Sequence, residues 1–433
     1  MRSYTLLLIA CLTLLVRCAP APREDVPTAI PFPTTTIGAQ MSGWLPTPVL
    51  GDSSNLANPA TAVARANQPT ATPNYHACPT GNTSLAFELP NDEATPIATA
   101  ILDFLNLGGN LQAIHHALLN ADRLGESGQV LQSLDMTGEL TPELIFTYRE
   151  REDIGIVLIL VCENNRYVIR YERDLPTIPT ILADEDLNRD GYNDLLFAVQ
   201  VCNPVDAFCE YSTTLVTWQP QRGIFVNLLL TAQEGDQLPQ VADVDNDSIM
   251  EIITLQQGTG TSQTGPIRAT TRIYDWNGIQ YVLSLTQPAP YRYRIEVLHA
   301  ADEAFAQNQM EQAGQLLRDS ITNTDLRVWF QDSENILTAY ALYRLLLVYT
   351  FAENGDALNV YQEARTRFSN LETSPIYAFL IETYWQTYQT SNNLHVACLA
   401  VQEVIAQRPD TLSLLNRYGS RSPTYEALEL CPF

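Results

Sequence analysis

The chain has 433 residues and a formal net charge of -25, and its 24 basic residues are all arginine. This length allows two or three domains with sizeable cores. Without lysine the protein has no phosphate-loop lysine, no lysine Schiff base and no Ser-x-x-Lys acylation centre. The acidic excess and the dispersed arginines also argue against a nucleic-acid partner, because neutralising phosphates requires clustered positive charge.

The first 18 residues have the pattern of an export signal. Arg2 precedes an apolar run over residues 6–16, which is shorter than the roughly 20 residues that span a bilayer. The segment resembles a bacterial lipoprotein signal, in which the cysteine that ends a Leu-x-x-Cys box becomes lipidated. That resemblance makes Cys18 the expected lipidation site, although Arg17 departs from the usual small residue there. Cys11 is the alternative site, and ordinary secretion or an uncleaved anchor is also open.

Residues 19–83 form a predicted linker rich in proline and threonine. It holds 11 of the 26 prolines and lacks an amphipathic period. Such a segment is extended, so it can hold a folded domain clear of a membrane surface. We therefore expect a protein displayed from the cell envelope or cell surface, with a lipid anchor as its only membrane contact.

Six further cysteines fit the same compartment. An even number of cysteines in an exported chain favours disulfides over metal thiolates, and no C-x-x-C motif is present. We expect Cys202 to pair with Cys209 across a short loop, and Cys398 with Cys431 at the C-terminus. Cys78 and Cys162 are the two that remain.

Three segments between residues 131 and 290 begin alike: DMTGELTPELIF at Asp135, DLNRDGYNDLLF at Asp186 and DVDNDSIMEIIT at Asp243. Each has oxygen-bearing side chains at positions 1, 3 and 5, a carboxylate at position 9, and then an apolar β-forming stretch. Two more strands follow in each unit. The second strands are expected at 155–161, 213–218 and 270–276, and the third strands begin at Tyr167, Phe225 and Tyr281.

The connections between the first two of these strands differ from unit to unit. They are short and charged at 149–153, bounded by cysteines at 202–209, and rich in glycine at 258–265. Variable loops at one equivalent position are where a repeat protein carries recognition. We therefore expect a protein or glycan partner to contact these loops.

The D-x-N-x-D-G-x-x-D loop at Asp186 resembles the calcium loop of FG-GAP and VCBS-type repeats, the units of integrin-like β-propellers. The third unit has Ser248 in place of the glycine. The first unit keeps only Asp135, Thr137, Glu139 and Glu143. Three units are fewer than the 4 to 8 blades of a closed propeller. The resemblance therefore implies an open or partial array with helices covering its ends.

Calcium binds six to eight hard oxygen ligands, which a tight loop supplies from alternate side chains and a carbonyl at position 7. Position 12 is not the glutamate of an EF-hand. Two structural calcium ions are the expected cofactors, and Asp184 is either a further ligand or exposed. The expected ligands are Asp186, Asn188, Asp190, the Tyr192 carbonyl and Asp194 in the second loop, and Asp243, Asp245, Asp247, the Ile249 carbonyl and Glu251 in the third.

Helical patterns flank the repeats. Thr95 and Pro96 begin a helix that stops at Gly108, and a second helix covers 111–119. From about residue 293 the pattern is helical, with expected hairpins at 294–320, 334–368 and 373–408. Their small-residue spacing resembles tetratricopeptide repeats, which implies a concave groove for a partner peptide.

The predicted fold is thus α+β and multidomain. A helical hairpin at 84–130 precedes a partial propeller-like β-repeat domain at 131–290, and an α-solenoid covers 291–433. The predicted protein is non-enzymatic: an extracytoplasmic, lipid-anchored calcium-binding module for interaction or adhesion. The alternative is a secreted, glycosidase-like hydrolase that uses a carboxylate pair and has structural calcium. No G-x-S-x-G, H-E-x-x-H or glycine-rich phosphate loop is present.

Overall fold

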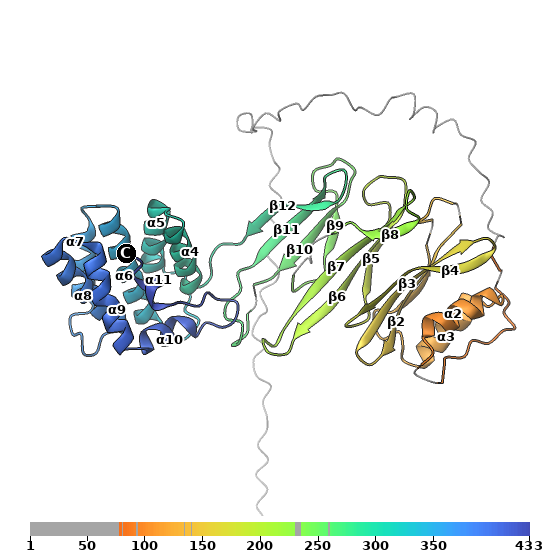
Figure 1. Ribbon diagram of the computed structural model, residues 1–433, viewed down its shortest axis with the longest axis horizontal. Coiled ribbons are helices and arrows are strands. Elements are labelled where there is room, and N and C mark those ends of the chain that lie inside the picture. The colour runs from red at the N-terminus through yellow and green to blue at the C-terminus, as the bar shows by residue number, and fades with distance from the viewer. Residues whose placement is uncertain are drawn as a thin grey trace, which may run out of the picture. The chain divides into compact units, whose positions relative to one another are not determined.

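The structure is a computed structural model that describes residues 78–79, 81–91, 94–133, 135–139, 141–229, 235–258 and 260–433. The predicted export signal with Cys11 and Cys18, and most of the predicted linker, lie outside the described residues. Residues Ala71–Phe433 form one compact unit. It contains three four-stranded antiparallel sheets and a C-terminal set of helices, so the fold class is α+β (Figure 1).

Two short helices precede the sheets, as predicted: α2 (Ile97–Asn106) and α3 (Leu111–Asn120). The side chain of Asn110 caps α3 by accepting a hydrogen bond from the Ala113 N–H. At the start of α2, Pro96 supplies no side-chain cap. Instead the Ile97 N–H donates to Glu150 Oε1 at 3.1 Å, so the first turn of α2 is satisfied by the neighbouring sheet.

Each repeat unit folds as one sheet whose strands are paired in chain order. The sequence predicted three strands after each acidic loop, and all of them are present. It missed a strand before each loop, because those strands are short and have no long apolar run. The first sheet is β1 (Gln129–Gln132), β2 (Leu144–Arg151), β3 (Ile154–Glu163) and β4 (Arg166–Leu175); the second is β5 (Thr180–Glu185), β6 (Asp194–Asn203), β7 (Phe208–Gln219) and β8 (Ile224–Asn227); the third is β9 (Gln240–Ala242), β10 (Glu251–Gln256), β11 (Thr270–Trp276) and β12 (Tyr281–Pro288).

The first sheet is buried on both faces, which explains the continuous apolar sequence of β3. Side chains alternate along a strand, so neighbouring residues face opposite sides of the sheet. Leu158 and Leu160 pack with α2 and α3. Val157 and Ile159 pack against Leu195 and other residues of the second sheet. The helical hairpin therefore covers one end of the sheet array, as expected.

The second and third sheets share another apolar cluster, which joins Leu196 and Leu215 to Ile252 and Tyr274. The described residues form no closed barrel or propeller. On β12, Leu283 and Leu285 are about half exposed, at 51% and 48%. The array is thus open in the described part of the chain.

The C-terminal region contains the three predicted helical hairpins. The central helix, α6, is apolar on all sides, which is the pattern of a helix surrounded by others. It packs against α4, α5, α7 and α8. The helices are α4 (Arg294–Ala306), α5 (Met310–Thr322), α6 (Glu334–Phe351), α7 (Ala357–Arg367), α8 (Ile376–Ser391), α9 (Leu394–Gln407), α10 (Asp410–Asn416) and α11 (Ala427–Leu430).

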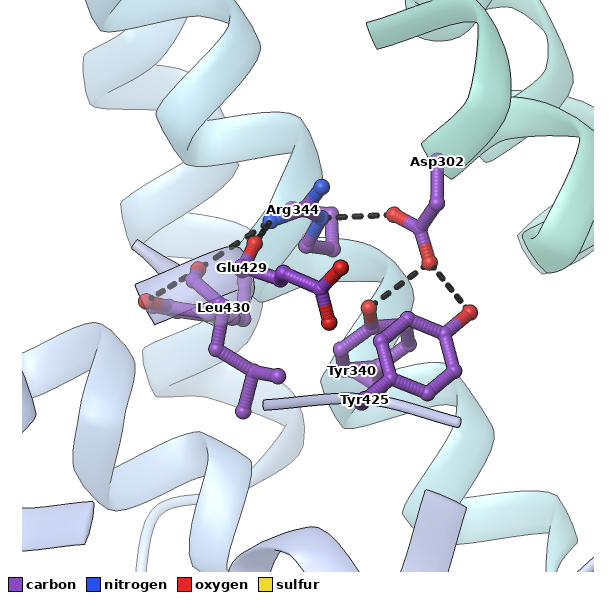
Figure 2. A network of polar contacts seen from close by, with 7 residues as sticks. Asp302, Tyr340, Arg344, Tyr425, Glu429 and Leu430 are labelled. Carbon is purple, nitrogen blue, oxygen red and sulfur yellow. Dashed lines mark hydrogen bonds and ion pairs between the residues drawn. The ribbon is translucent and has the colours of Figure 1, made fainter. Parts of the chain in front are cut away.

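The last residues of the chain lie against helices α6 and α9. Arg344 Nη1 donates to the Glu429 carbonyl at 2.9 Å (Figure 2). Tyr343 donates its hydroxyl hydrogen to the Leu430 carbonyl at 3.0 Å. A disulfide between Cys398 and Cys431 ties the same segment to α9. The C-terminal residues are therefore fixed to α6 by hydrogen bonds and to α9 by a disulfide.

The structure contains three disulfides: Cys78–Cys162, Cys202–Cys209 and Cys398–Cys431. They indicate an oxidising, extracytoplasmic compartment. Cys78 is bonded to β3, so the folded part begins inside the segment whose composition predicted a linker. Among the helices of the described chain, none is both long and apolar enough to cross a bilayer.

Candidate metal sites in the acidic loops

Each acidic loop connects the first and second strands of its sheet. The carboxylate at position 9 is the first residue of the second strand in two units, Asp194 of β6 and Glu251 of β10. In the first unit Glu143 directly precedes β2. The antiparallel pairing of the two strands therefore returns position 9 to the start of the loop, so the ends of the nine-residue motif meet.

The backbone of the second and third loops is curled in the same way. Arg189 and Gly191 have φ values of 60° and 93°, and Asn246 and Ser248 have 67° and 75°. These left-handed positions alternate with the side chains at positions 1, 3 and 5. Such residues turn the chain so that those three side chains point to one side.

In the second loop the turned side chains accept hydrogen bonds from their own backbone. Asp186 Oδ1 and Asn188 Oδ1 both accept from the Asp190 N–H, at 3.1 and 3.0 Å. Asp190 Oδ1 accepts from the Tyr192 N–H at 2.9 Å. The oxygens of positions 1, 3 and 5 thus converge on one short stretch of chain.

The third loop repeats this arrangement, with Asp247 N–H donating to Asp243 and Asp245, and Ile249 N–H donating to Asp247. One carboxylate oxygen of each of the three aspartates lies within 4.8 Å of the other two. In the second loop Asn188 replaces the middle aspartate, and no such group of three carboxylates forms there among the described residues.

The position-9 carboxylate makes the same first contact in all three loops. One of its oxygens accepts a hydrogen bond from the backbone N–H of position 2. This N–H belongs to Met136, Leu187 and Val244 in turn. Since Glu143, Asp194 and Glu251 are only 1%, 0% and 3% exposed, each loop is closed around a buried carboxylate.

The second oxygen of the position-9 carboxylate has a hydrogen-bond partner in the first loop but has none in the other two loops of the described chain. In the first loop Thr137 donates its hydroxyl hydrogen to Glu143 Oε1 at 2.7 Å. Asp194 Oδ1 and Glu251 Oε1 are buried and have no hydrogen-bond partner in the described chain. Such atoms are costly, because burial removes their water without replacing it. The sequence pattern includes Thr137 only as an oxygen-bearing residue at position 3, whereas in the structure its hydroxyl satisfies the second oxygen of Glu143.

Burial also makes the ionised forms of these carboxylates unfavourable. Burial, together with the neighbouring Asp190 and Asp186, raises the pKa of Asp194 to about 7. The nearby Thr217 hydroxyl lowers this pKa in part, although it has no hydrogen-bond partner of ordinary geometry in the described chain. Burial raises the pKa of Glu143 to about 7 as well. A cation beside Asp194 would restore its ionised form.

The loops lie next to one another in a row. Arg189 Nε donates to the Ser248 carbonyl at 2.9 Å, which joins the second loop to the third. The ring of Tyr192 lies against Gly138 of the first loop, where an added Cβ would be 2.7 Å from the ring. Asp184 is not part of this group, because it accepts a hydrogen bond from Ser133 at 2.7 Å.

All three variable connections make contacts inside the molecule. The backbone of Gln263, in the glycine-rich connection, accepts a hydrogen bond from the Ser420 N–H at 2.8 Å. Asp206, in the connection bounded by cysteines, accepts from the Ser420 hydroxyl at 2.8 Å. These two loops therefore hold the C-terminal segment. The 149–153 connection instead contacts the N-terminal helical hairpin, where Glu150 accepts from Ile97 N–H at 3.1 Å and from Arg123 Nη1 at 2.9 Å, and its residues 151–153 are exposed.

The helical region contains a cavity of about 930 Å³ whose lining includes four carboxylates. Each of them already has a role in the fold. Glu296 caps α4, Asp302 pairs with Arg344, Glu303 accepts from Gln307, and Glu429 accepts from the Glu426 N–H. One buried oxygen of Glu296 has no hydrogen-bond partner in the described chain.

No protein-family model matches the chain, and no curated protein matches its sequence.

Proposed function

We propose that the protein is an extracytoplasmic display module whose sheets are stabilised by two calcium ions, bound in the second and third acidic loops. The observation that carries this proposal is the pair of buried, unpartnered carboxylate oxygens on Asp194 and Glu251. Both lie at the loop position where the first unit has its carboxylate satisfied by Thr137. A cation would supply the missing partner in the two loops that lack this hydroxyl.

The residues present fit calcium better than a softer metal. All the side chains in question offer oxygen, and no histidine or cysteine belongs to either loop, so zinc and copper are disfavoured. In the second loop Asp186, Asn188, Asp190 and Asp194 would hold the ion, and in the third Asp243, Asp245, Asp247 and Glu251. The carbonyls of Tyr192 and Ile249 would complete the two sets. The ion would neutralise the clustered carboxylates and fix the loops.

The display role rests on the disulfides and on the sequence. Three disulfides suit an exported chain, and the first 18 residues resemble a lipoprotein signal with Cys18 as the lipidated residue. The open sheet array and the 149–153 connection leave surface for a protein or glycan partner. We propose adhesion or assembly rather than catalysis, because the carboxylates around the 930 Å³ cavity are committed to the fold.

The experiment compares calcium content and stability of the purified full-length protein. Wild type is expected to hold two calcium ions by elemental analysis after dialysis against about 2 mM calcium. Removing calcium with a chelator should lower the free energy of unfolding by about 0.7 to 2 kcal/mol for each ion, as expected for sites of extracellular affinity. An unchanged melting temperature with no calcium bound would refute the proposal.

Matched variants separate the loops. Asp194→Asn and Glu251→Gln should each lower the calcium content from two ions to one. Thr137→Val, which acts on the first loop, should leave two ions bound while destabilising the protein with or without calcium. Equal calcium content in Asp194→Asn and Thr137→Val would show that the unpartnered oxygens are not the ligands. Cross-linking on the native envelope with and without chelator then tests for a calcium-dependent partner.

A further inference from the structure

Three arginines that are dispersed in the sequence meet at one end of the helical region. Arg294 is the first residue of α4, Arg327 lies between α5 and α6, and Arg367 is the last residue of α7. Together they line a cavity of about 730 Å³. The only carboxylate among the described lining residues is Glu334. This local positive charge stands out in a chain whose net charge is -25.

The backbone fixes two of these arginines beside each other. The Arg294 N–H donates to the Arg327 carbonyl at 2.9 Å, and the Arg327 N–H donates to the Arg292 carbonyl at 2.9 Å. These two bonds form a short parallel bridge between the start of α4 and the chain before α6. The bridge holds the positions before any ligand binds, which lowers the ordering cost of binding.

The guanidinium of Arg294 is buried and incompletely satisfied. The residue is 7% exposed, and its Nη1 donates to Thr338 Oγ1 at 2.8 Å. Its Nε has no hydrogen-bond partner in the described chain. Burial lowers the pKa of Arg294, Glu334 raises it, and the nearby Arg367 lowers it again. The side chain therefore carries a charge that its surroundings do not balance.

Glu334 balances only part of the charge. Its carboxylate is 3.9 Å from Arg294 Nη2, and its side chain is 69% exposed. Neither Arg327 nor Arg367 forms a side-chain ion pair with any described residue. Other arginines of the same region are paired closely, as Arg344 is with Asp302 at 2.6 Å. The pocket is thus lined by three arginines, of which Arg294 is buried, and by one carboxylate residue, Glu334, whose side chain is largely exposed.

We propose that this pocket binds an oxyanion group, a phosphate or a sulfate. Planar guanidinium groups donate paired hydrogen bonds to tetrahedral oxyanions, and such charge-assisted bonds are strong where water is partly excluded. Asn323 and Asn335 also line the cavity, and their amides are suited to the hydroxyls of a sugar that carries the anion. The site lies apart from the acidic loops and does not depend on their calcium.

The experiment measures binding by isothermal titration calorimetry on the full-length protein, in calcium-free buffer at constant ionic strength. The probes are inorganic phosphate, sodium sulfate and glucose 1-phosphate, with glucose as the uncharged control. Saturable binding of one equivalent is expected for at least one of the charged probes, and no binding for glucose. Tighter binding of glucose 1-phosphate than of inorganic phosphate would identify a sugar-borne group, and the reverse a free anion.

Three variants locate the site. Arg367→Gln, at the exposed end of α7, should weaken binding about tenfold, as expected for losing one charge-assisted hydrogen bond. Glu334→Gln should strengthen binding, because it removes the one opposing carboxylate. Arg222→Gln makes the same charge change on the turn between β7 and β8 and should leave the affinity unchanged. An equal loss in Arg367→Gln and Arg222→Gln, or no saturable binding by wild type, would overturn the proposal.

Discussion

The carboxylate of Asp302 in the helical region and those of Asp194 and Glu251 in the sheets differ in how completely they are hydrogen-bonded. In the helical region Asp302 has partners on both oxygens: Arg344 Nε donates to one at 2.6 Å, and the hydroxyls of Tyr340 and Tyr425 donate to the other at 2.7 and 2.8 Å (Figure 2). In the sheets Asp194 and Glu251 each keep one buried oxygen without a partner in the described chain. Both oxygens of Asp302 thus have hydrogen-bond partners, whereas Asp194 and Glu251 each have one oxygen without a partner in the described chain.

One buried oxygen of Glu296 in the helical region also lacks a hydrogen-bond partner in the described chain. What distinguishes Asp194 and Glu251 is therefore their place in loops that hold further acidic side chains. Leaving a buried carboxylate oxygen without a partner costs more than leaving a neutral group. The first acidic loop shows that the sheets can avoid this cost, since Thr137 satisfies Glu143 there. In the second and third loops the carboxylate at the same position keeps an unpartnered oxygen, and other acidic oxygens lie beside it. A bound cation would lower the electrostatic free energy of such a cluster.

The largest effect is expected where the network is complete. Asp302→Ala should lower the free energy of unfolding by about 3 to 5 kcal/mol, because it leaves the buried charge of Arg344 without its partner. Urea unfolding measured with and without calcium should give the same loss. Asp332→Ala is the control, since it removes an exposed partner of Arg417 and should cost at most about 1 kcal/mol. A calcium-dependent loss in Asp302→Ala would break the separation between the two regions.

A second effect concerns His299 of α4, whose ring lies 6.1 Å from the ring of Tyr425 in this network. Burial lowers the pKa of His299 to about 4 from an ordinary 6.5. Between these values the unfolded chain binds a proton and the folded chain does not, so stability rises with pH from about 4 to 6.5. Relative to His299→Gln, wild type should lose about 3 kcal/mol between pH 7 and pH 4.

Urea unfolding of both proteins across this pH range measures the difference. Comparing wild type with the variant at each pH cancels the opposite contributions of Asp194 and Glu143, whose raised pKa values favour low pH in the calcium-free protein. Parallel pH profiles of the two proteins would contradict the prediction, because they would show that the pKa of His299 is the same in the folded and unfolded protein.

Much of the architecture could be predicted from the sequence, because it depends on local patterns. The apolar run of β3 and the aromatic starts of β4, β8 and β12 were sufficient to place those strands. The helical hairpins followed from the spacing of apolar residues. The first strand of each sheet could not be found in this way, because β9 has three residues and is defined by its pairing with β10 rather than by its own composition.

The candidate sites show the same limit more clearly. The spacing of acidic residues placed Asp186, Asp190 and Asp194 in one loop, since their proximity follows from a short stretch of chain. Whether the second oxygen of the position-9 carboxylate has a hydrogen-bond partner depends on a single hydroxyl in the first loop, and no sequence rule distinguishes Thr137 as a donor from Thr137 as a ligand. The arginine pocket was invisible, because Arg294 and Arg367 meet only through the packing of the helices.

The smallest expected effect compares the two loops that share the incomplete carboxylate. Ser248 has a φ of 75°, a left-handed conformation that costs a non-glycine residue about 1 kcal/mol, whereas Gly191 occupies the equivalent position of the second loop. Ser248→Gly should therefore raise the free energy of unfolding by up to about 1 kcal/mol, less the greater freedom of glycine in the unfolded chain.

Gly191→Ala should lower the free energy of unfolding by about 1 kcal/mol through backbone strain alone, because nothing lies within 4 Å of an added Cβ there. Thermal unfolding with and without calcium measures both. Opposite signs in the two variants would show that the loops share one backbone requirement, and destabilisation by Ser248→Gly would show that the serine side chain has a role in the third loop that its backbone conformation does not explain.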